Sequence, residues 1–185
     1  ALLELPSDLP RPPVQSFKGA IETFTLDHHL TRDLKQLAQK SGSSIFMILH
    51  SALTALCFRY TGQADIVLGT SVANRNRKEI EPIIGFFVNT LALRTDLSGD
   101  PMFSELLARV KQTTLDAYAH QDIPFERLVE ELQPERNLSY NPLFQVMLIW
   151  QNVPAQEFDL PGLEVSYLNT EYASAKFDLT LDMEE

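Results

Sequence analysis

Cysteine is nearly absent from this chain, with one residue in 185. A disulfide needs a second cysteine and a zinc centre built on thiolates needs several, so the sequence excludes both. Cys57 lies in the apolar run IFMILHSALTALCFRY, where a thiol behaves as a small hydrophobic side chain. A nucleophilic cysteine would need an exposed electropositive setting and a neighbouring base. We therefore expect a core role for Cys57, no metal site, and a reducing, cytoplasmic compartment.

Positive charge is also scarce, with 15 Lys and Arg against 25 Asp and Glu and a formal net charge of -10. Binding to nucleic acid requires clustered Lys and Arg that displace counterions from phosphates, so nucleic acid is not an expected partner. The densest basic cluster is Arg75, Arg77 and Lys78, and Glu79 and Glu81 follow it closely. We expect this cluster to form a solvated loop.

Long apolar runs are missing as well. His50 and Ser51 interrupt the longest one and Arg59 closes it, so no segment reaches the length of a bilayer span. The opening ALLELPSDLPRPP lacks the basic start and the apolar core of a signal peptide. A membrane is therefore not an expected partner. With 44% hydrophobic residues, the chain can bury one sizeable core, as a domain or as one lobe of a larger domain.

The chain starts with a proline-rich segment. Pro6, Pro10, Pro12 and Pro13 each fix a backbone angle and remove a hydrogen-bond donor. Residues 1–16 are therefore predicted to be an extended linker, and residues 17–185 to form the folded unit.

Hydrophobic periodicity predicts a mixture of helices and strands after this linker. Asp27 as N-cap and Gly42 as stop bound an amphipathic helix whose apolar residues fall at i, i+4, i+7 and i+8. The other predicted elements are strands at 18–26, 65–72, 84–94, 143–150, 163–167 and 177–183, and helices at 44–60, at 103–118 and from Pro124 onward. These elements indicate an α/β fold, a two-layer sandwich of helices on one mostly mixed sheet.

One motif resembles a catalytic signature without completing it. His28, His29 and Asp33 spell H-H-x-x-x-D, the beginning of a signature in several acyltransferases whose second His is a general base. That signature continues with a Gly that lets the backbone turn sharply, whereas Leu34 follows here and belongs to the apolar stripe of the helix. We therefore interpret His29 and Asp33 as an exposed i, i+4 pair worth a few tenths of a kcal/mol.

The phrase IGFFVNTLALR at residues 84–94 places a polar amide among apolar residues. Gly85 precedes two aromatic residues and permits close approach of the backbone, and Asn89 shares the strand parity of Phe87. A buried amide must find hydrogen-bond partners or face a ligand channel. Asn89 is therefore either a structural amide satisfied by a neighbouring loop or a residue that faces such a channel.

Two further phrases mix polar and apolar residues in the same way. In HQDIPFERLVEEL at residues 120–132, His120, Gln121 and Asp122 lie between two helices, and we expect Asp122 to accept backbone donors at the start of the next helix. In RNLSYNPLFQVM at residues 136–147, Arg136 is expected to hold a carboxylate inside the fold, and Asn141 with Pro142 forms a turn that enters a strand.

Taken in order, these phrases closely resemble one family, the condensation domains of nonribosomal peptide synthetases. The resemblance rests on RYTGQADIVLGTSVANR at 59–75, IGFFVNTLALR at 84–94, AHQDIPFERLVEELQPERNLSYNPLFQV at 119–146 and AKFDLTL at 175–181. It covers nearly the whole chain from Pro10 onward. The chain departs from the family pattern at Ser71, Asn137 and Tyr140, which bears on subfamily and substrate class.

The resemblance implies a chloramphenicol acetyltransferase-like lobe, the C-terminal one of two lobes that meet at a tunnel. Carrier domains would deliver donor and acceptor on 4′-phosphopantetheine arms, and no cofactor would bind directly. The implied partners are peptidyl and aminoacyl carrier domains, the N-terminal lobe of the same condensation domain and a neighbouring adenylation domain. Residues 1–16 would then connect the lobes, and residues 17–185 would be a C-terminal lobe truncated at its C-terminal end.

The resemblance also assigns roles to residues. The catalytic H-H-x-x-x-D-G motif belongs to the other lobe, so this segment has no catalytic residue of its own. Asn89 is the main candidate for the tunnel wall, with Thr70 and Ser71 as further ones, while the motif residues with structural roles are Gly85, His120, Asp122, Pro124, Arg136 and Asn141. Two alternatives remain: a non-catalytic module that docks carriers or scaffolds a synthetase, and a lobe of the related epimerization domains.

Overall fold

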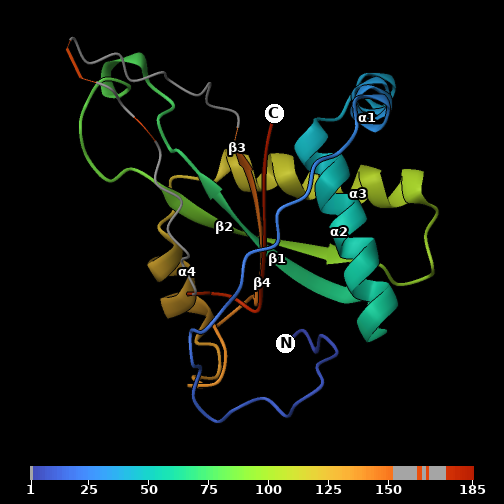
Figure 1. Cartoon of the computed structure of the whole chain (residues 1–185), viewed down its shortest axis with the longest axis vertical. Helices are drawn as coiled ribbons and strands as arrows, with labels where there is room; N and C mark the ends of the chain where they lie inside the picture. The colour runs from blue at the N-terminus through green and yellow to red at the C-terminus, as the bar shows by residue number, and fades with distance from the viewer. Residues whose placement is uncertain (1, 152–161, 164–165, 167–173) are drawn as a thin grey trace.

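The computed structural model describes residues 2–151, 162–163, 166 and 174–185. Along this part of the chain, helices and strands alternate around one sheet (Figure 1). The elements are α1 (His28–Ser41), α2 (Ile45–Thr61), β1 (Asp65–Val72), the 3-10 helix η1 (Lys78–Ile80), β2 (Asn89–Asp96), α3 (Phe103–Ala119), α4 (Phe125–Leu132), β3 (Val146–Gln151) and β4 (Leu179–Glu184).

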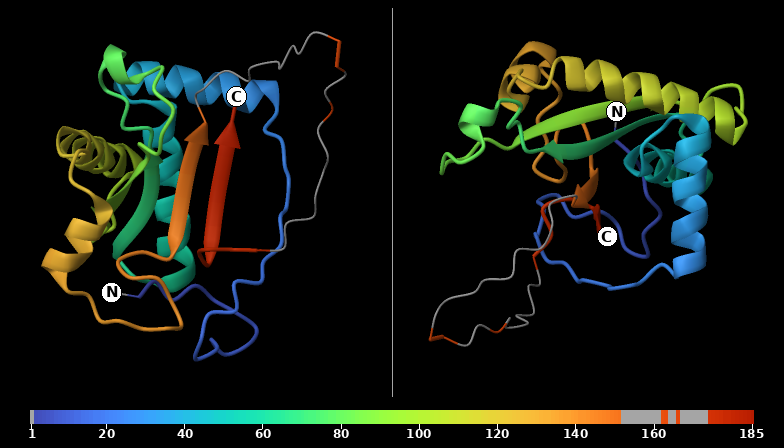
Figure 2. Two further views of the ribbon diagram at one scale, coloured as in Figure 1. Left: turned by 90° about the vertical axis from the view of Figure 1, so that its left-hand side faces the viewer. Right: turned by 90° about the horizontal axis from the view of Figure 1, so that it is seen from above.

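The sheet is mixed, with the strand order β2-β1-β3-β4. β1 pairs with β2 in the antiparallel sense, with Leu68 opposite Leu93, and with β3 in the parallel sense, with Leu68 opposite Val146. β4 continues the sheet in parallel with β3 and forms one edge (Figure 2). The predicted α/β fold with helices on a mixed sheet is confirmed.

The helix boundaries follow from local capping. The Asp27 side chain accepts a hydrogen bond from Leu30 N at 2.8 Å, and the left-handed Gly42 ends α1, as the sequence predicts. Ser44 caps α2 in the same way, and Gly62, also left-handed, ends that helix. Each cap satisfies backbone groups that the helix leaves without a partner. The predicted caps of α1 are confirmed, and α2 lies within one residue of the predicted range 44–60 at each end.

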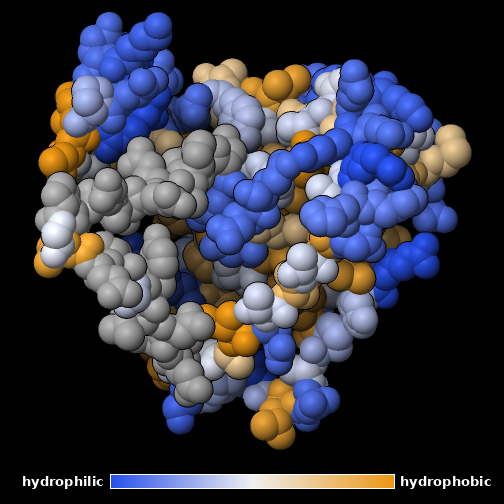
Figure 3. Space-filling view, turned by 45° about the horizontal axis from the view of Figure 1, so that its top comes forward, coloured by the Kyte–Doolittle hydropathy of each residue, from blue (hydrophilic) through white to orange (hydrophobic). Residues whose placement is uncertain are grey.

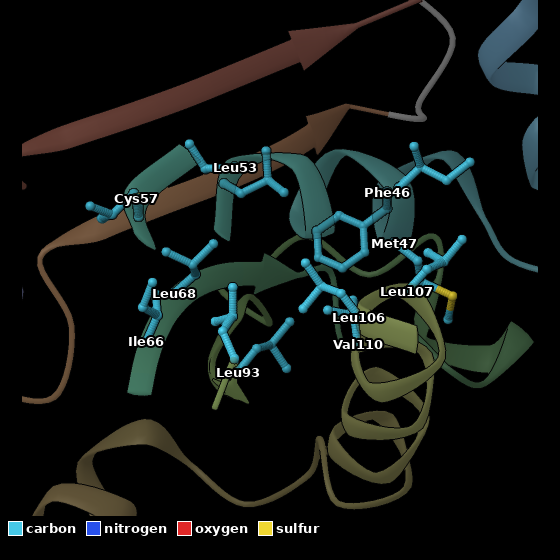
Figure 4. Packing of buried hydrophobic residues seen from close by; sticks show 14 of the residues in the cluster. Phe46, Met47, Leu53, Cys57, Ile66, Leu68, Leu93, Leu106, Leu107 and Val110 are labelled. Carbon is cyan, nitrogen blue, oxygen red and sulfur yellow. The ribbon is translucent and has the colours of Figure 1, made fainter. Parts of the chain in front are cut away.

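The main core lies between the β1–β2 ladder and the helices α2 and α3 (Figure 4). Ile66 and Leu68 from β1 and Leu93 from β2 point to the same face of the sheet, where Leu53 and Val110 from the two helices meet them. Cys57 is buried in this cluster, and burial raises the pKa of its thiol, so the prediction of a core cysteine is confirmed.

The opposite face of β1 carries a second, aromatic cluster. Gly69 alternates with Leu68 and therefore points away from the main core. A Cβ atom at Gly69 would lie 2.1 Å from the Phe144 ring, so only glycine lets this ring lie against the strand. Phe144 stacks on Phe177 and meets Phe125 of α4 edge-on, with ring centroids 5.4 and 5.6 Å apart.

Two predicted strands differ from the structure. Residues 18–26 form no strand: Lys18 makes an isolated bridge with Ser174, and the remainder runs extended because no strand edge lies against it. The strand predicted at 84–94 begins at Asn89, because β1 offers pairing partners only up to Val72, opposite Asn89. The strand predicted at 163–167 lies outside the described residues, apart from positions 163 and 166.

Among the described residues, no single helix has the length and apolar composition of a membrane span, although α1 and α2, bent by 103° at their junction, pass that test as a pair.

Candidate functional site

The candidate residues Thr70, Ser71 and Asn89 lie together at one end of the β1–β2 ladder. In the antiparallel register, Ser71 is opposite Thr90 and Val72 is opposite Asn89. Thr70 is buried and points to the main core, whereas Ser71 points to the opposite face. The three residues therefore share one end of the sheet but not one surface.

Asn89 connects the start of β2 to the loop before α4. Its Nδ2 donates to the carbonyl oxygens of Gln121 and Ile123, both at 2.7 Å. Its Oδ1 accepts from the backbone N–H of Thr90 at 2.9 Å and of Phe125 at 3.2 Å. The amide is thus satisfied by a neighbouring loop, one of the two interpretations that the sequence leaves open. Its place on a tunnel wall stays a prediction.

The cap of α4 corrects another expectation. The first turn of α4 receives the Asn89 side chain, because Asn89 Oδ1 accepts from Phe125 N, while the N-cap residue Pro124 has no side-chain donor or acceptor. Asp122 is exposed, and its Oδ1 accepts from Asn76 Nδ2 at 3.3 Å. The predicted capping role of Asp122 is therefore wrong: a residue distant in sequence caps the helix.

Arg75 organises the long loop between β1 and β2. Its Nη1 donates to the carbonyl oxygens of Ile80 and Ile83 at 2.5 and 2.8 Å, and its Nη2 to that of Gly85 at 3.3 Å. The guanidinium also lies 4.3 Å from the centroid of the Phe87 ring. The expectation of a solvated basic loop holds for the exposed Arg77 and Lys78 and is wrong for Arg75.

This loop displays apolar side chains to the outside. Ile84 is 100% exposed and Phe86 is 92% exposed, and Ile83 and Val88 are about half exposed. Gly85 lies between them, where a Cβ atom would lie 3.1 Å from the Phe87 ring. Ile123, in the loop that Asn89 holds, is also half exposed. Large apolar residues on one projecting loop are typical of a contact surface. We call residues 83–88 the apolar loop.

The remaining motif residues have peripheral positions. Arg136 is exposed, so the expectation that it lies inside the fold is wrong, and within the described residues no ion pair joins it to a carboxylate. Asn141 Nδ2 donates to Lys176 O, and Asn141 O accepts from Gln145 Nε2 at 2.9 Å, which fixes the turn before β3. His120 ends α3, with its Nδ1 2.9 Å from Asp116 O.

The incomplete histidine motif lies on the surface of α1, as predicted. His29 Nδ1 is 3.2 Å from Asp33 Oδ2, and these side chains are 75% and 49% exposed. Leu34 packs against the main core. An exposed imidazole with a solvated carboxylate has no enclosed space in which to act on a substrate.

A wide, open cleft of about 2910 Å³ lies between residues 2–26, the helices α1 and α2, and the β3–β4 edge of the sheet. Thr90, Met147 and Ile149 point into it from the sheet, and residues 2–26, which cross in front of the sheet in Figure 1, form much of its other side. Figure 3 shows hydrophobic atoms recessed between hydrophilic ones at the centre of its view. Asn89, Thr70 and Ser71 are not among the lining residues.

Sequence reasoning missed the cleft residues although their signal was present. Thr90 directly follows Asn89 within IGFFVNT and has the opposite strand parity, so it points away from the main core, and it lines the cleft. Met147 and Ile149 alternate with the core residues Val146 and Leu148 on β3. Alternation could have assigned these residues to a face, but the cleft itself depends on residues 2–26 lying across the sheet.

Besides Cys57, the main core region also buries the imidazole of His50. His50 is 1% exposed, and burial lowers the pKa of its imidazole to about 4. Its Nδ1 lies 3.4 Å from Thr54 Oγ1, and its Nε2 has no hydrogen-bond partner within the described part of the chain. The imidazole is therefore neutral around pH 7. Within the described residues, no cluster of His, Cys, Asp or Glu could hold a metal ion.

The sequence of this chain is similar to parts of several peptide synthetases. The chain is 56% identical to part of linear gramicidin synthase from Brevibacillus parabrevis, over 97% of this chain and 2% of the matched polypeptide. It is 53% identical to malpinin synthetase of Mortierella alpina, over 100% of this chain and 2% of that protein. The chain thus spans a small part of these relatives.

Solved structures share its fold. The X-domain from teicoplanin biosynthesis has a TM-score of 0.91 at 32% identity, and the match covers 100% of this chain and 41% of that one. A four-domain nonribosomal peptide synthetase bound to AMP and glycine has a TM-score of 0.78 at 30% identity, over 81% of this chain and 11% of that one. The model of the family named Condensation domain matches residues 1–185. This chain therefore belongs to the condensation domain family.

Proposed function

We propose that this chain is the C-terminal lobe of a condensation domain and that it forms one wall of the tunnel in which a peptide bond is made. The observation that carries this proposal is the asymmetry of the structural match: the X-domain structure covers all of this chain, yet the chain covers 41% of that structure. The remaining part of such a domain would supply a second lobe with the catalytic histidine.

The partner of this lobe is, in this proposal, the N-terminal lobe of the same domain. The apolar loop supports it, because Ile84 and Phe86 are almost completely exposed and Arg75 holds the backbone that presents them. Burying two such side chains would contribute about 3 kcal/mol or more to an inter-lobe contact. Ile123 lies in the neighbouring loop and extends the same apolar surface.

The proposed reaction joins two substrates carried on 4′-phosphopantetheine arms of carrier domains. The amine nitrogen of the acceptor attacks the thioester carbonyl carbon of the donor, the C–S bond breaks, and the amine proton leaves with the thiol. A histidine of the upstream lobe would move that proton. This lobe would orient the two arms, which can lower the barrier by several kcal/mol. Asn89 and Ser71 are the proposed wall residues, and Thr90 joins them because it lines the cleft, whereas Thr70 is buried against the main core and is no longer a candidate.

Reconstitution with loaded carrier domains tests the division of labour between the lobes. We expect the intact domain to form the peptide, this chain alone to form none, and substitution of the second His of an upstream H-H-x-x-x-D-G motif by Ala to abolish the reaction. Turnover by this chain alone, lost in His29→Ala, would overturn the proposal.

Two threonines on opposite faces of β2 test the proposed tunnel wall. Thr90 and Thr95 are on the same strand but on opposite faces, Thr90 lining the cleft and Thr95 buried in the main core with an unpartnered Oγ1 among the described residues. In the intact domain, Thr90→Val should slow condensation about tenfold. Thr95→Val removes an unsatisfied hydroxyl and should leave the rate unchanged. Equal rates in both variants would remove the cleft face from the proposed wall.

A second candidate function is a non-catalytic docking module. It is favoured by the structural similarity to the teicoplanin X-domain, which has also been solved in complex with OxyB, with a TM-score of 0.89 and 31% identity. In that case the domain would bind a partner protein and form no peptide bond. An epimerization domain would instead invert a carrier-bound residue. Product analysis by mass spectrometry and chiral chromatography distinguishes these outcomes.

A further inference from the structure

The proline-rich segment at residues 2–18 follows a fixed path along the lobe, although the sequence predicts a linker. Its first fixed point is in the core, where Leu3 is 4% exposed and its N–H donates to Gln145 Oε1 at 2.8 Å. Gln63 holds the residues on either side of Leu3: its Nε2 donates to Leu2 O at 2.9 Å and its Oε1 accepts from Glu4 N at 2.7 Å. The start of the segment is thereby part of the fold.

The second fixed point is an ion pair. Both guanidinium Nη atoms of Arg11 contact the Asp178 carboxylate, with Nη1 at 2.9 Å from Oδ1, and the contact raises the pKa of Arg11. Arg11 Nη1 also donates to Ser139 O at 3.3 Å, and Ser139 Oγ donates to Pro12 O at 2.6 Å. A bidentate pair with a planar guanidinium fixes direction as well as distance.

The third fixed point lies at the end of the segment. Gln15 N donates to Leu138 O at 2.8 Å, and Gln15 Nε2 donates to Lys176 O at 3.1 Å. Ala175 N donates to Phe17 O at 2.8 Å, beside the Lys18–Ser174 bridge. The three fixed points lie along one stretch stiffened by Pro6, Pro10, Pro12 and Pro13, so the segment cannot pivot freely between them.

From this path we infer that Arg11 and Gln63 are positioning residues, which turn the connection to the upstream lobe into a brace. This inference rests on the proposed function, in which residues 1–16 connect the two lobes. Because residues 2–18 are fixed to this lobe, a change of inter-lobe angle must pivot before residue 2. The same brace forms one side of the cleft that Thr90 lines, so releasing it changes both the lobe orientation and the cleft width.

Four variants of the intact condensation domain, one of them a double variant, test the brace. Arg11→Ala removes the ion pair, and Arg11→Lys keeps the charge but loses the planar fork. Gln63→Glu keeps the acceptor for Glu4 N and loses the donor for Leu2 O. The double variant Arg11→Asp with Asp178→Arg restores the pair in reverse. Arg127→Ala is the matched control, because Arg127 contacts only Glu130 and Glu131 of its own helix among the described residues.

The main readout is the distribution of distances between spectroscopic labels on the two lobes. We expect Arg11→Ala and Gln63→Glu to broaden it and the charge-reversed double variant to restore part of it, while Arg127→Ala leaves it unchanged. In Arg11→Ala and Gln63→Glu, kcat should fall about tenfold while the KM for the loaded carriers stays unchanged, because the orientation of the substrates is lost and their binding is not. A purely structural role for Arg11 would lower the melting temperature without broadening the distribution of folded molecules.

The inference and the proposed function fail in different ways. Unchanged distances in Arg11→Ala, Arg11→Lys and Gln63→Glu would overturn the brace even if the wild-type domain is active. An inactive wild-type domain would overturn the proposed reaction, and the distance distributions would still decide whether residues 2–18 brace the lobes. Should Arg11→Ala fail to fold, Arg11→Lys and Gln63→Glu give the same comparison with smaller changes.

Discussion

The β1–β2 side of the sheet and the β4 side differ in how completely helices cover the same face. On the β1–β2 side, Leu68 is 0% exposed because α2 and α3 close over it, whereas Leu179 on the edge strand β4 is 41% exposed. Both residues point to the same face in the strand register. The covered side holds the fold together, while the cleft, the brace and the apolar loop lie at the less covered periphery. The proposed wall residues Ser71 and Thr90 belong to the covered part but point to the face opposite Leu68, so stability and the proposed function depend on different faces of the same strands.

The largest expected effect comes from comparing the same substitution on both sides. Leu68→Ala should lower the free energy of unfolding by about 3 kcal/mol, because it removes a buried side chain and leaves a cavity. Leu179→Ala should cost about 1 kcal/mol or less, since the side chain is already partly in water. Chemical denaturation of the intact domain measures both. Equal losses would show that the β4 side is as well covered as the β1 side.

Acid should lower the free energy of unfolding by protonating the buried imidazole of His50 on the covered side. Its folded pKa of about 4 lies below the ordinary 6.5, so the neutral form stabilises the fold above pH 6.5 and this contribution is lost as the pH falls towards 4. The loss should reach about 3 kcal/mol. His50→Leu should flatten the denaturation profile in this pH range, while His120→Leu, at an exposed helix end, serves as the control. An unchanged profile in His50→Leu would assign the acid sensitivity to other groups.

Asn89 lies at the start of β2 and joins this strand to the loop before α4, so its loss should affect both stability and function. Asn89→Ala leaves two carbonyl groups and the N–H of Phe125 without their partner, at a cost of about 2 kcal/mol, because water reaches part of this loop. If Asn89 also faces the tunnel, condensation should slow by more than this loss of stability explains. Asn89→Asp keeps an oxygen that can accept from Thr90 N and Phe125 N, and it loses both N–H donors to the carbonyl groups of Gln121 and Ile123. A rate that follows stability in both variants would make Asn89 purely structural.

The smallest effect is expected on the exposed face of α1. His29→Ala should change the free energy of unfolding by about 0.5 kcal/mol or less, because the pair with Asp33 is solvated. The condensation rate of the intact domain should stay the same. A rate reduced tenfold or more would contradict the interpretation of His28, His29 and Asp33 as a helix surface.

Local signals explain why part of the fold can be predicted from the sequence. Asp27 and Gly42 act within one helical turn, so the sequence predicts the bounds of α1 correctly. The apolar run at 44–60 predicts α2 to within one residue at each end. Residues 84–88 look like the first half of a strand, but a strand needs a partner, and the pairing with β1 ends at Asn89. The alternation of side chains along the sequence does not show where this strand pairing ends.

The candidate site is harder to predict because its contacts are long-range. The sequence marks Asn89 as an amide in need of partners, but its partners Gln121, Ile123 and Phe125 follow after the whole of α3. Arg11 meets Asp178 across almost the full chain, and proline content alone predicts only an extended path for its segment. The sequence identifies residues with unusual requirements, whereas the sheet order decides how each requirement is met.

The parallel pairing of β1 with β3 also has a consequence for synthesis on the ribosome. β1 can pair with β2 as a hairpin-like unit early, but its other edge waits until α3, α4 and β3 have been made. Contacts between residues so far apart in sequence slow folding. During that wait, the open edge of β1 can pair with a strand of another chain. Correct assembly of this fold therefore depends on the order in which its segments emerge as well as on its final contacts.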